Sequence, residues 1–355
     1  SSHMACTSKP LSEDTSGDGT GMEEPPSPEI VTVFEATRVS SRADAEHYQR
    51  AETLVDFGVE SVSRAVLRVE LESPCFPFEK WSADAIPTGH NWPRLCDAFD
   101  RLLVVSLDPP ELPATAPPAL EVARAVTPFG GPAAFETDVT DLVNGLPGTH
   151  RLRIDIGTWG DASGMVSGSE GEWIVRAALS LEHGTAPRRV LAVVPLVASA
   201  QTVARGSAAV FTVPESATSG RIEYFATGHG GAALEPGCGG PAEEFCRRTH
   251  TLFLDGTPAD EFSPWRNDCA SFCTLTRYSG SDLLTAFDYC LENPCGAVAS
   301  VRAPRANWCP GTAVLPYAVQ GVMALAPGEH EFRADVNAIA EGGQWMIGAT
   351  YFAYE

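Results

Sequence analysis

The chain has 355 residues, with 24 lysines and arginines against 46 aspartates and glutamates, and its net charge is −22. This acidic balance, without any cluster of basic residues, excludes a protein that grips a nucleic-acid backbone. Hydrophobic residues make up 44% of the chain, but no apolar run reaches the roughly 20 residues of a membrane-spanning helix. The length suits one large domain or two of ordinary size.

Residues 1–29 are predicted to form a disordered tail. The first four residues have the character of a cloning remnant, and Ser, Gly, Pro and acidic residues follow from Thr7 to about Glu29 without periodicity. Cys6 stands at the front of this tail, as in a bacterial lipoprotein after removal of its signal peptide. A lipid anchor at Cys6 is one interpretation and a stray cysteine is the other.

The rest of the chain predicts a nearly all-β protein, because short apolar or alternating runs are separated by Gly, Pro and Asp turns. Strands are expected at residues 65–71, 102–107, 152–156, 173–179, 190–194, 221–225 and 346–352. One short helix is expected from residue 138 to 143, with Asp138 or Thr140 as its N-cap. A polar break at residues 182–187 predicts two tightly joined β-sandwich domains, residues 30–184 and 185–355.

Ten cysteines indicate an oxidising compartment and disulfide bonds. Cys75 and Cys96 flank one segment, Cys238 and Cys246 flank another, and five more cysteines crowd residues 269–309. Zinc is the alternative explanation for this crowding, but the chain has no paired Cys-x-x-Cys or Cys/His set with zinc-finger spacing.

Two stretches place an acid close to a cysteine. A strand that continued through residues 244–254 and ended at the Asp255-Gly256 turn would align Glu244, Cys246, Arg248 and His250 on one face. In the first half, Cys96 and Asp100 would share a face if the strand at residues 102–107 began early. A disulfide would then hold each acid rigid, as acid–base catalysis requires. Solvated strand ends with mutually paired side chains are the alternative.

Six motifs resemble bacterial peptide-N-glycosidase F in sequence and in order, over roughly residues 30–355. They are Cys-Asp-Ala-Phe-Asp-Arg at 96–101, Phe-Glu-Thr-Asp-Val-Thr-Asp at 135–141, Ala-Val-Val-Pro at 192–195, Gly-His at 228–229, Glu-Phe-Cys-Arg-Arg-Thr-His-Thr at 244–251, and Arg-Ala-Asn-Trp-Cys-Pro-Gly at 305–311.

The resemblance implies two adjacent jelly rolls with an active site in the cleft between them. That family hydrolyses the amide between N-acetylglucosamine and asparagine in N-glycosylated peptides or proteins, without a metal or other cofactor. The resemblance further implies that Asp100 is the essential acid, which acts through an ordered water, and that Glu244 is the second carboxylate beside it. It implies that Arg305 and Trp308 are cleft residues that contact sugar or peptide, with His229 and Arg101 close by as further substrate-binding residues. The rings of Trp308 and Trp159 suit the apolar face of a pyranose. A bacterial monomer is expected, secreted or held as a periplasmic or outer-membrane lipoprotein.

By analogy of position, the resemblance also implies disulfides between Cys75 and Cys96, Cys238 and Cys246, and Cys269 and Cys309, with Cys290–Cys295 or a pairing of Cys273 in addition. The chain departs from the family at Gly157, where a third cleft glutamate is expected, and at Phe99, Thr227 and Phe245, where the best-known member has tryptophan. These departures could weaken activity or sugar stacking.

Two other classes of protein compete with the enzyme. One is a catalytically inactive glycan-binding surface lipoprotein with the same fold, which Gly157 favours. The other is a copper monooxygenase built on a similar pair of jelly rolls, with His229, His250, His330 and Met346 as candidate ligands. The spacing of these histidines matches no copper site.

Overall fold

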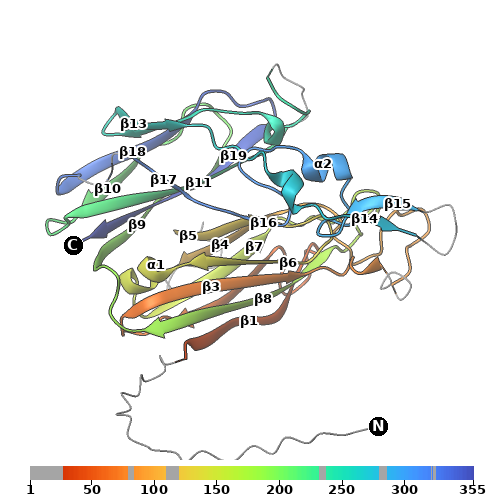
Figure 1. The fold of residues 1–355 in the computed structure, drawn as a ribbon, viewed down its shortest axis with the longest axis horizontal. Coiled ribbons are helices and arrows are strands. Elements are labelled where there is room, and N and C mark those ends of the chain that lie inside the picture. The colour runs from red at the N-terminus through yellow and green to blue at the C-terminus, as the bar shows by residue number, and fades with distance from the viewer. Residues whose placement is uncertain are drawn as a thin grey trace, which may run out of the picture.

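The computed structural model describes residues 27–78, 84–108, 120–231, 237–279, 286–320, 322 and 325–355. The first half of the chain forms β1 (Glu29–Ser40), β2 (Arg50–Asp56), β3 (Val62–Glu72), β4 (Leu102–Asp108), β5 (Leu120–Val126), β6 (Ala133–Asp138), α1 (Thr140–Gly145), β7 (Thr149–Ile156) and β8 (Glu172–His183) (Figure 1).

The second half begins with β9 (Val190–Gln201), β10 (Ala209–Val213), β11 (Ser219–Gly230), the 3₁₀ turn η2 (Glu243–Phe245), β12 (His250–Leu254), β13 (Thr257–Phe262) and the 3₁₀ turn η3 (Cys269–Phe272). It continues with β14 (Leu275–Tyr278), β15 (Phe287–Cys290), α2 (Val298–Arg302), β16 (Thr312–Val314), β17 (Tyr317–Ala318), β18 (Gly328–Val336) and β19 (Gly343–Tyr354).

The first sandwich consists of the sheets β1-β8-β3-β6 and β16-β5-β4-β7-β2. Alternate side chains of each strand face the space between the sheets, as the period of a β-strand requires. On β3, for example, Leu67, Val69 and Leu71 are buried in this core, and on β8 Val175 and Leu179 are buried with them. Burial of such side chains is the main force that holds the two sheets together.

The second sandwich consists of the sheets β10-β18-β12-β13 and β17-β11-β19-β9. Its core includes Phe211, Ile222, Leu252, Phe332 and Ile347, which come from five strands of the two sheets. The chain is therefore all-β with two adjacent jelly-roll sandwiches, as expected. The predicted division between residues 184 and 185 falls between the end of β8 and the start of β9; it stays a prediction.

All seven expected strands and the short helix are present. The expected N-cap is wrong, because α1 begins at Thr140 and its N-cap position is Val139, which makes no side-chain capping bond. Asp138 accepts only a local hydrogen bond from the backbone N–H of Thr140, at 2.9 Å. The long strand expected from residue 244 is wrong in its first part, because β12 begins only at His250. The early start expected for the strand at residues 102–107 is also wrong, because β4 begins at Leu102.

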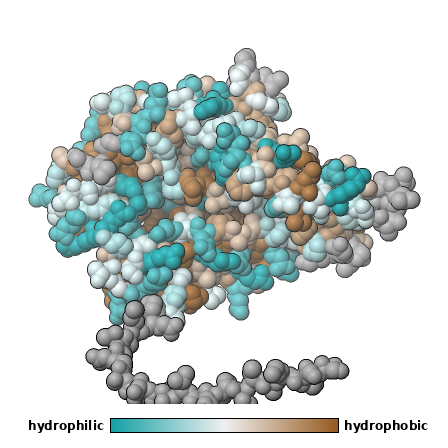
Figure 2. All heavy atoms as spheres, viewed as in Figure 1, coloured by the Kyte–Doolittle hydropathy of each residue, from teal (hydrophilic) through white to brown (hydrophobic). Residues whose placement is uncertain are grey.

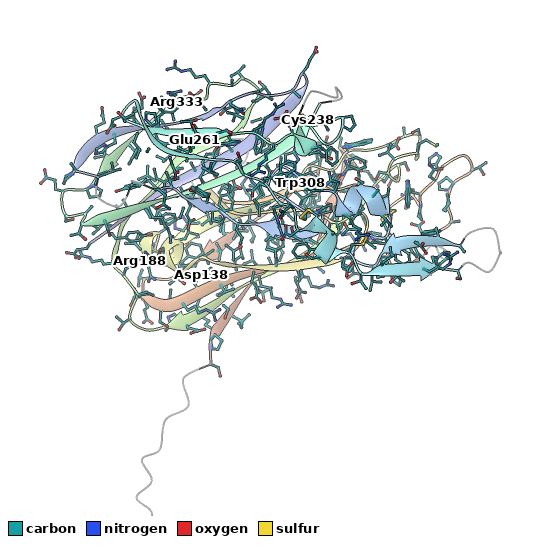
Figure 3. All side chains as sticks on the ribbon, turned by 45° about the horizontal axis from the view of Figure 1, so that its top comes forward. Asp138, Arg188, Cys238, Glu261, Trp308 and Arg333 are labelled. Atoms are coloured by element: carbon teal, nitrogen blue, oxygen red, sulfur yellow. A yellow bond between two sulfur atoms is a disulfide. The ribbon has the colours of Figure 1, made fainter. Side chains whose placement is uncertain are left out.

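One strand crosses between the two halves of the chain. β16 comes from the second half but pairs antiparallel with β5, at the edge of a sheet of the first sandwich. Beside it, Val126 of β5 packs with Phe225 and Trp308 in a small apolar cluster. In Figure 3, Trp308 lies between the two sandwiches.

A second link lies around α1. Asp141 is buried and accepts hydrogen bonds from Arg188 at 3.0 Å, from Arg221 at 3.1 Å and from the Tyr354 hydroxyl at 2.9 Å. These partners precede β9 or lie on β11 and β19, so an ion-pair network joins the helix to the second sandwich. Asp138 and Arg188, labelled in Figure 3, line a cavity of about 450 Å³ at this end.

The segment between β13 and β16 contains the β14–β15 hairpin and α2 and is held by two disulfides. Cys269 is bonded to Cys309, as the resemblance implies, and Cys273 is bonded to Cys290. The alternative pairing of Cys290 with Cys295 is wrong, because pairing of Leu275 with Cys290 in the hairpin brings Cys273 against Cys290. In Figure 2, apolar side chains gather over the hairpin and α2; among the exposed ones are Leu275, Phe287 and Leu291.

The other two disulfides, Cys75–Cys96 and Cys238–Cys246, are formed as expected. Cys295 is a free thiol, and Cys6 with its possible lipid anchor lies outside the described residues. None of the helices in the described parts of the chain has the length and apolar character to cross a membrane.

Candidate active site

Asp100 lies on the loop that leads from Cys96 into β4. The Cys75–Cys96 disulfide ties the start of this loop to the end of β3. Its far end is fixed by Arg101, whose backbone N–H donates to the Thr127 hydroxyl at 2.8 Å. Asp100 itself is half-buried and lies between these two anchored points of the loop.

A fully buried carboxylate, Asp97, organises this loop from beneath. It is 0% exposed and pairs with the guanidinium of Arg101 through bonds of 2.7, 2.9 and 3.1 Å. It also accepts hydrogen bonds from the Ser167 hydroxyl at 3.1 Å and the Trp173 indole N–H at 3.2 Å. A buried charge is tolerated only when it is paired and its oxygens are satisfied, and Asp97 meets both conditions.

Glu244 lies on the 3₁₀ turn η2, and its neighbour Glu243 organises that turn in the same manner. Glu243 is 0% exposed and accepts two bonds of 2.9 Å from the guanidinium of Arg248. It also accepts the Trp345 indole N–H at 2.8 Å and the backbone N–H of Ala340 at 2.7 Å. Since consecutive side chains of the turn point in different directions, burial of Glu243 leaves Glu244 free to point elsewhere.

The two halves of the site thus share one construction. In each, a buried carboxylate binds an arginine a few residues further on and the N–H of a fully buried tryptophan. A disulfide lies beside each of them, at Cys96 and at Cys246. The sequence analysis missed Asp97 and Glu243; the available signal was an acid followed by arginine four or five residues later, next to a cysteine.

Asp100 and Glu244, from different sandwiches, interact electrostatically. Burial and the negative charge of Glu244 raise the pKa of Asp100 from its ordinary 3.8 to about 7, against the opposing charges of Arg305 and Arg101. Burial also raises the pKa of Glu244, while its ion pair with Arg305 acts in the opposite direction. The fold therefore brings both sequence-predicted carboxylates, together with Arg305, into one site.

Arg305 is the buried ion-pair partner of Glu244. It is 0% exposed, is ion-paired with Glu244, and donates to the Ser300 carbonyl and hydroxyl, both at 2.9 Å. Its guanidinium lies over the rings of Phe245 at 4.7 Å and Trp308 at 4.5 Å. Because Arg305 is fully buried, we propose that it does not make the direct contact with substrate that was expected. It instead holds the Glu244 carboxyl group in place and favours its ionised form.

Trp308 and His229 lie stacked behind this arginine. Their rings are 5.4 Å apart, and the Trp308 indole N–H donates to the Gly228 carbonyl at 3.0 Å. Trp308 is only 1% exposed, so we propose that it supports the site and is not a sugar platform. Burial and the charges of Arg124 and Arg305 lower the pKa of His229 to about 3, so this histidine is neutral at physiological pH.

Exposed rings lie on the Asp100 side of the site. Trp159 is 42% exposed and Phe99 is 40% exposed, and the Arg101 guanidinium lies over them at 4.9 and 5.2 Å. Arg101 itself is 4% exposed, so we propose that it orients these rings in place of contacting substrate. Phe99 had been noted only as a departure from the family, and its exposure makes it a candidate stacking residue.

Gly157, where the family glutamate is expected, lies at the same edge of the sheet. Its N–H donates to the Leu102 carbonyl at 3.2 Å, two residues beyond Asp100. It is exposed, and the nearest atom to an added Cβ would be that carbonyl oxygen at 4.0 Å. The position has room for a side chain.

Two groups of described side chains are close enough to share a metal ion: Cys75, Cys96 and Cys295, and Asp268, Cys269 and Cys309. Each contains a disulfide pair. His250, one of the copper-ligand candidates, instead binds the Tyr224 hydroxyl in the core at 2.8 Å, and burial lowers its pKa to about 3.

Comparisons with known proteins bear on the fold and on the second half of the chain. Residues 198–350 match the family model described as "Peptide-N-glycosidase F, C terminal". A search of curated proteins gave no match.

Several solved structures share the fold, among them the following three. PNGF-II superposes on this chain with a TM-score of 0.66 and 17% identity, over 92% of this chain and 65% of PNGF-II. PNGase F, a glycosylasparaginase from Flavobacterium meningosepticum, superposes on this chain with a TM-score of 0.64 and 18% identity, over 93% of this chain and 96% of PNGase F. A recombinant peptide:N-glycanase F (PNGase F) superposes on this chain with a TM-score of 0.62 and 19% identity, over 92% of this chain and 96% of the recombinant enzyme. The chain thus spans about 65% of the length of PNGF-II.

Proposed function

We propose that the chain, whose residues 198–350 match the C-terminal family model of peptide-N-glycosidase F and whose fold is similar to that of PNGase F, is a glycoamidase. It hydrolyses the amide between N-acetylglucosamine and asparagine in N-glycosylated peptides or proteins, releases the glycan and leaves aspartate. The observation that carries this proposal is the electrostatic coupling of Asp100 with Glu244 across the two sandwiches, beside Arg305.

Amide hydrolysis needs a group that takes a proton from water and returns one to the departing nitrogen. Asp100 suits both steps, because a carboxyl group with a pKa of about 7 is populated in both protonation states near neutral pH. Its ionised form accepts a proton from the attacking water, and its protonated form then donates that proton to the leaving nitrogen. The anchored loop keeps the carboxyl group in place between the two steps.

Glu244 has a different role in this proposal. Its side chain is 21% exposed, while its partner Arg305 is buried, so a ligand meets the carboxylate and not the guanidinium. Arg305 favours the ionised form of Glu244, which then accepts hydrogen bonds from a sugar hydroxyl or from the reacting water. The exposed rings of Trp159 and Phe99 stack against apolar pyranose faces.

The test is incubation with a denatured N-glycopeptide, followed by mass analysis of both products. The proposal expects free glycan and a peptide with aspartate at the former glycosylation site. Cleavage that leaves one N-acetylglucosamine on the peptide would mean a glycosidase and would overturn it.

Glu244→Gln tests the coupling of the two carboxylates. The variant removes the charge that raises the pKa of Asp100 and leaves the opposing charge of Arg305 in place. We therefore expect weaker activity whose rise with pH has a lower midpoint than in the wild type. The pH dependence of glycan release measures this directly, and an unchanged or higher midpoint would contradict the coupling.

Gly157 favours a second candidate function, a glycan-binding protein that has kept the fold and lost the reaction. In that case the wild-type chain would bind N-glycopeptides but release no glycan over a broad pH range. The test separates the two functions, because binding without release supports the second one only.

Gly157→Glu is expected to be tolerated and to change activity. The position is exposed and open, so the free energy of unfolding should stay within about 0.5 kcal/mol of the wild type. A further carboxylate near Asp100 should raise the pKa of Asp100 and shift the pH midpoint of glycan release upward. Gly157→Gln is the matched control, because it adds the same volume without charge and should leave the midpoint unchanged.

The four disulfides and the fold favour an extracellular location. We further propose a monomer that acts on glycopeptides outside the cell, with Cys6 as a possible lipid anchor.

A further inference from the structure

The free thiol of Cys295 lies beside the Cys75–Cys96 disulfide. The three sulfur atoms are all within 4.8 Å of one another, although Cys295 comes from the second half of the chain and the disulfide belongs to the first. We propose that this cluster is a thiol–disulfide exchange site, in which Cys295 attacks Cys75 and displaces Cys96.

Specific contacts bring Cys295 to this place. Its backbone N–H donates to the Phe129 carbonyl at 3.0 Å, and the side chain of Asn293 accepts from the Phe129 N–H at 3.0 Å. These bonds dock the segment after β15 onto the loop between β5 and β6 of the first sandwich. The position of the thiol is therefore set by hydrogen-bonded backbone.

Gly130 shows how tightly the sulfur atoms are packed. A Cβ atom at Gly130 would lie 2.4 Å from Cys295 Sγ and 3.2 Å from Cys75 Sγ. The backbone φ of Gly130 is also +68°, a value that residues with a side chain rarely adopt. The absence of a side chain at this position lets Cys295 and Cys75 share one small space, and for this reason Cys75 is the sulfur that we assign as the one attacked.

The exchange balances without any external oxidant. The thiolate of Cys295 forms a bond to Cys75 Sγ, the Cys75–Cys96 bond breaks, and Cys96 leaves as a thiolate that takes up the proton lost by Cys295. One disulfide and one thiol are present before and after. Burial and the charge of Asp97 raise the pKa of the Cys295 thiol, so the exchange runs through a small thiolate fraction. Cys75–Cys96 is the bonded pair in the structure and is therefore taken as the resting state.

The two states differ in what the disulfide holds. In the resting state the bond fixes the start of the loop that carries Asp97 and Asp100. In the exchanged state it joins the end of β3 to the segment before α2, so the two halves of the chain become covalently linked and Cys96 is released. This inference does not depend on the proposed enzymatic activity, and its tests do not use that activity.

The first test is Cys96→Ser in the full chain, with free thiols alkylated in acid and disulfides mapped by mass spectrometry. We expect a peptide in which Cys75 is bonded to Cys295. Recovery of both as alkylated thiols would overturn the proposal. Cys246→Ser is the matched control: it orphans Cys238, which lies in neither of the described three-ligand groups, and Cys238 should be recovered alkylated.

The second test uses the wild-type chain and remains decisive if the variant does not fold. Samples are incubated at neutral pH with an alkylating agent present, so that any released Cys96 thiol is trapped, and are quenched in acid at intervals. The Cys6 thiol is scored separately on its own peptide. We expect alkylated Cys96 and the Cys75–Cys295 peptide to accumulate together with time, and Cys295→Ser should abolish both signals. Alkylation of Cys295 alone at all times would refute the exchange.

Discussion

Asp100→Asn is expected to abolish glycan release and, at the same time, to stabilise the folded protein near neutral pH. A positioned acid–base group contributes a factor of about 100 to 10,000 to the rate, and asparagine can neither take nor supply the proton. Stability should rise because asparagine resembles the protonated carboxyl group that the folded site favours. A loss of activity caused by misfolding would instead be accompanied by lower stability.

The pH dependence gives this prediction its sign. The pKa of Asp100 is about 7 in the folded protein, and about 3.9 is expected in the unfolded chain. Below the unfolded pKa both states hold the proton, so the substitution changes little. As the pH rises to 7 the unfolded chain ionises first, and the wild-type protein loses stability by up to about 4 kcal/mol, an upper limit for a half-buried group.

Denaturant unfolding of wild type and Asp100→Asn at pH 4 and pH 7 measures this difference. We expect nearly equal free energies of unfolding at pH 4 and a more stable variant at pH 7. Asp97→Asn is the contrasting variant, because Asp97 is fully buried against Arg101 and its loss should destabilise the protein at pH 7. Equal stability of wild type and Asp100→Asn at both pH values would contradict the raised pKa.

The sequence predicted the fold well where the signal is local. Strands such as β3 and β8 alternate apolar and polar residues over their length, so their positions and buried faces could be predicted from periodicity. β16 has only three residues, and its partner β5 lies far away in the chain. Pairing of that kind depends on the packing of the two sandwiches, which no local pattern encodes.

The candidate site was predictable in its residues but not in its geometry. Motif resemblance singled out Asp100, Glu244 and Arg305, and the fold brings them together. It also singled out Trp308, whose burial depends on the contact between the sandwiches. The expected strand face through Glu244 was wrong because Glu243 pairs with Arg248 and thereby bends residues 243–245 into a turn. A side-chain network of this kind outweighs β propensity.

Glu243→Ala should be among the most destabilising substitutions in the chain. It removes the acceptor of two bonds from Arg248, of the Trp345 indole N–H and of the Ala340 backbone N–H. Breaking a buried ion pair by removing one partner costs about 3 to 5 kcal/mol, because the remaining charge is left in the interior. Denaturant unfolding measures this cost, and Glu244→Gln, which keeps an acceptor for Arg305, is the matched control with a smaller expected change.

Glu243→Gln separates a positioning role from a purely structural one. Glutamine keeps one acceptor oxygen but loses the charge opposite Arg248, so the protein should remain folded while η2 shifts. If Glu243 positions Glu244, displacement of the Glu244 carboxylate reduces its effect on Asp100, and the pH midpoint of glycan release should fall as it does in Glu244→Gln. A folded variant with lower stability but an unchanged midpoint would show that Glu243 supports the second sandwich without setting the geometry of the site.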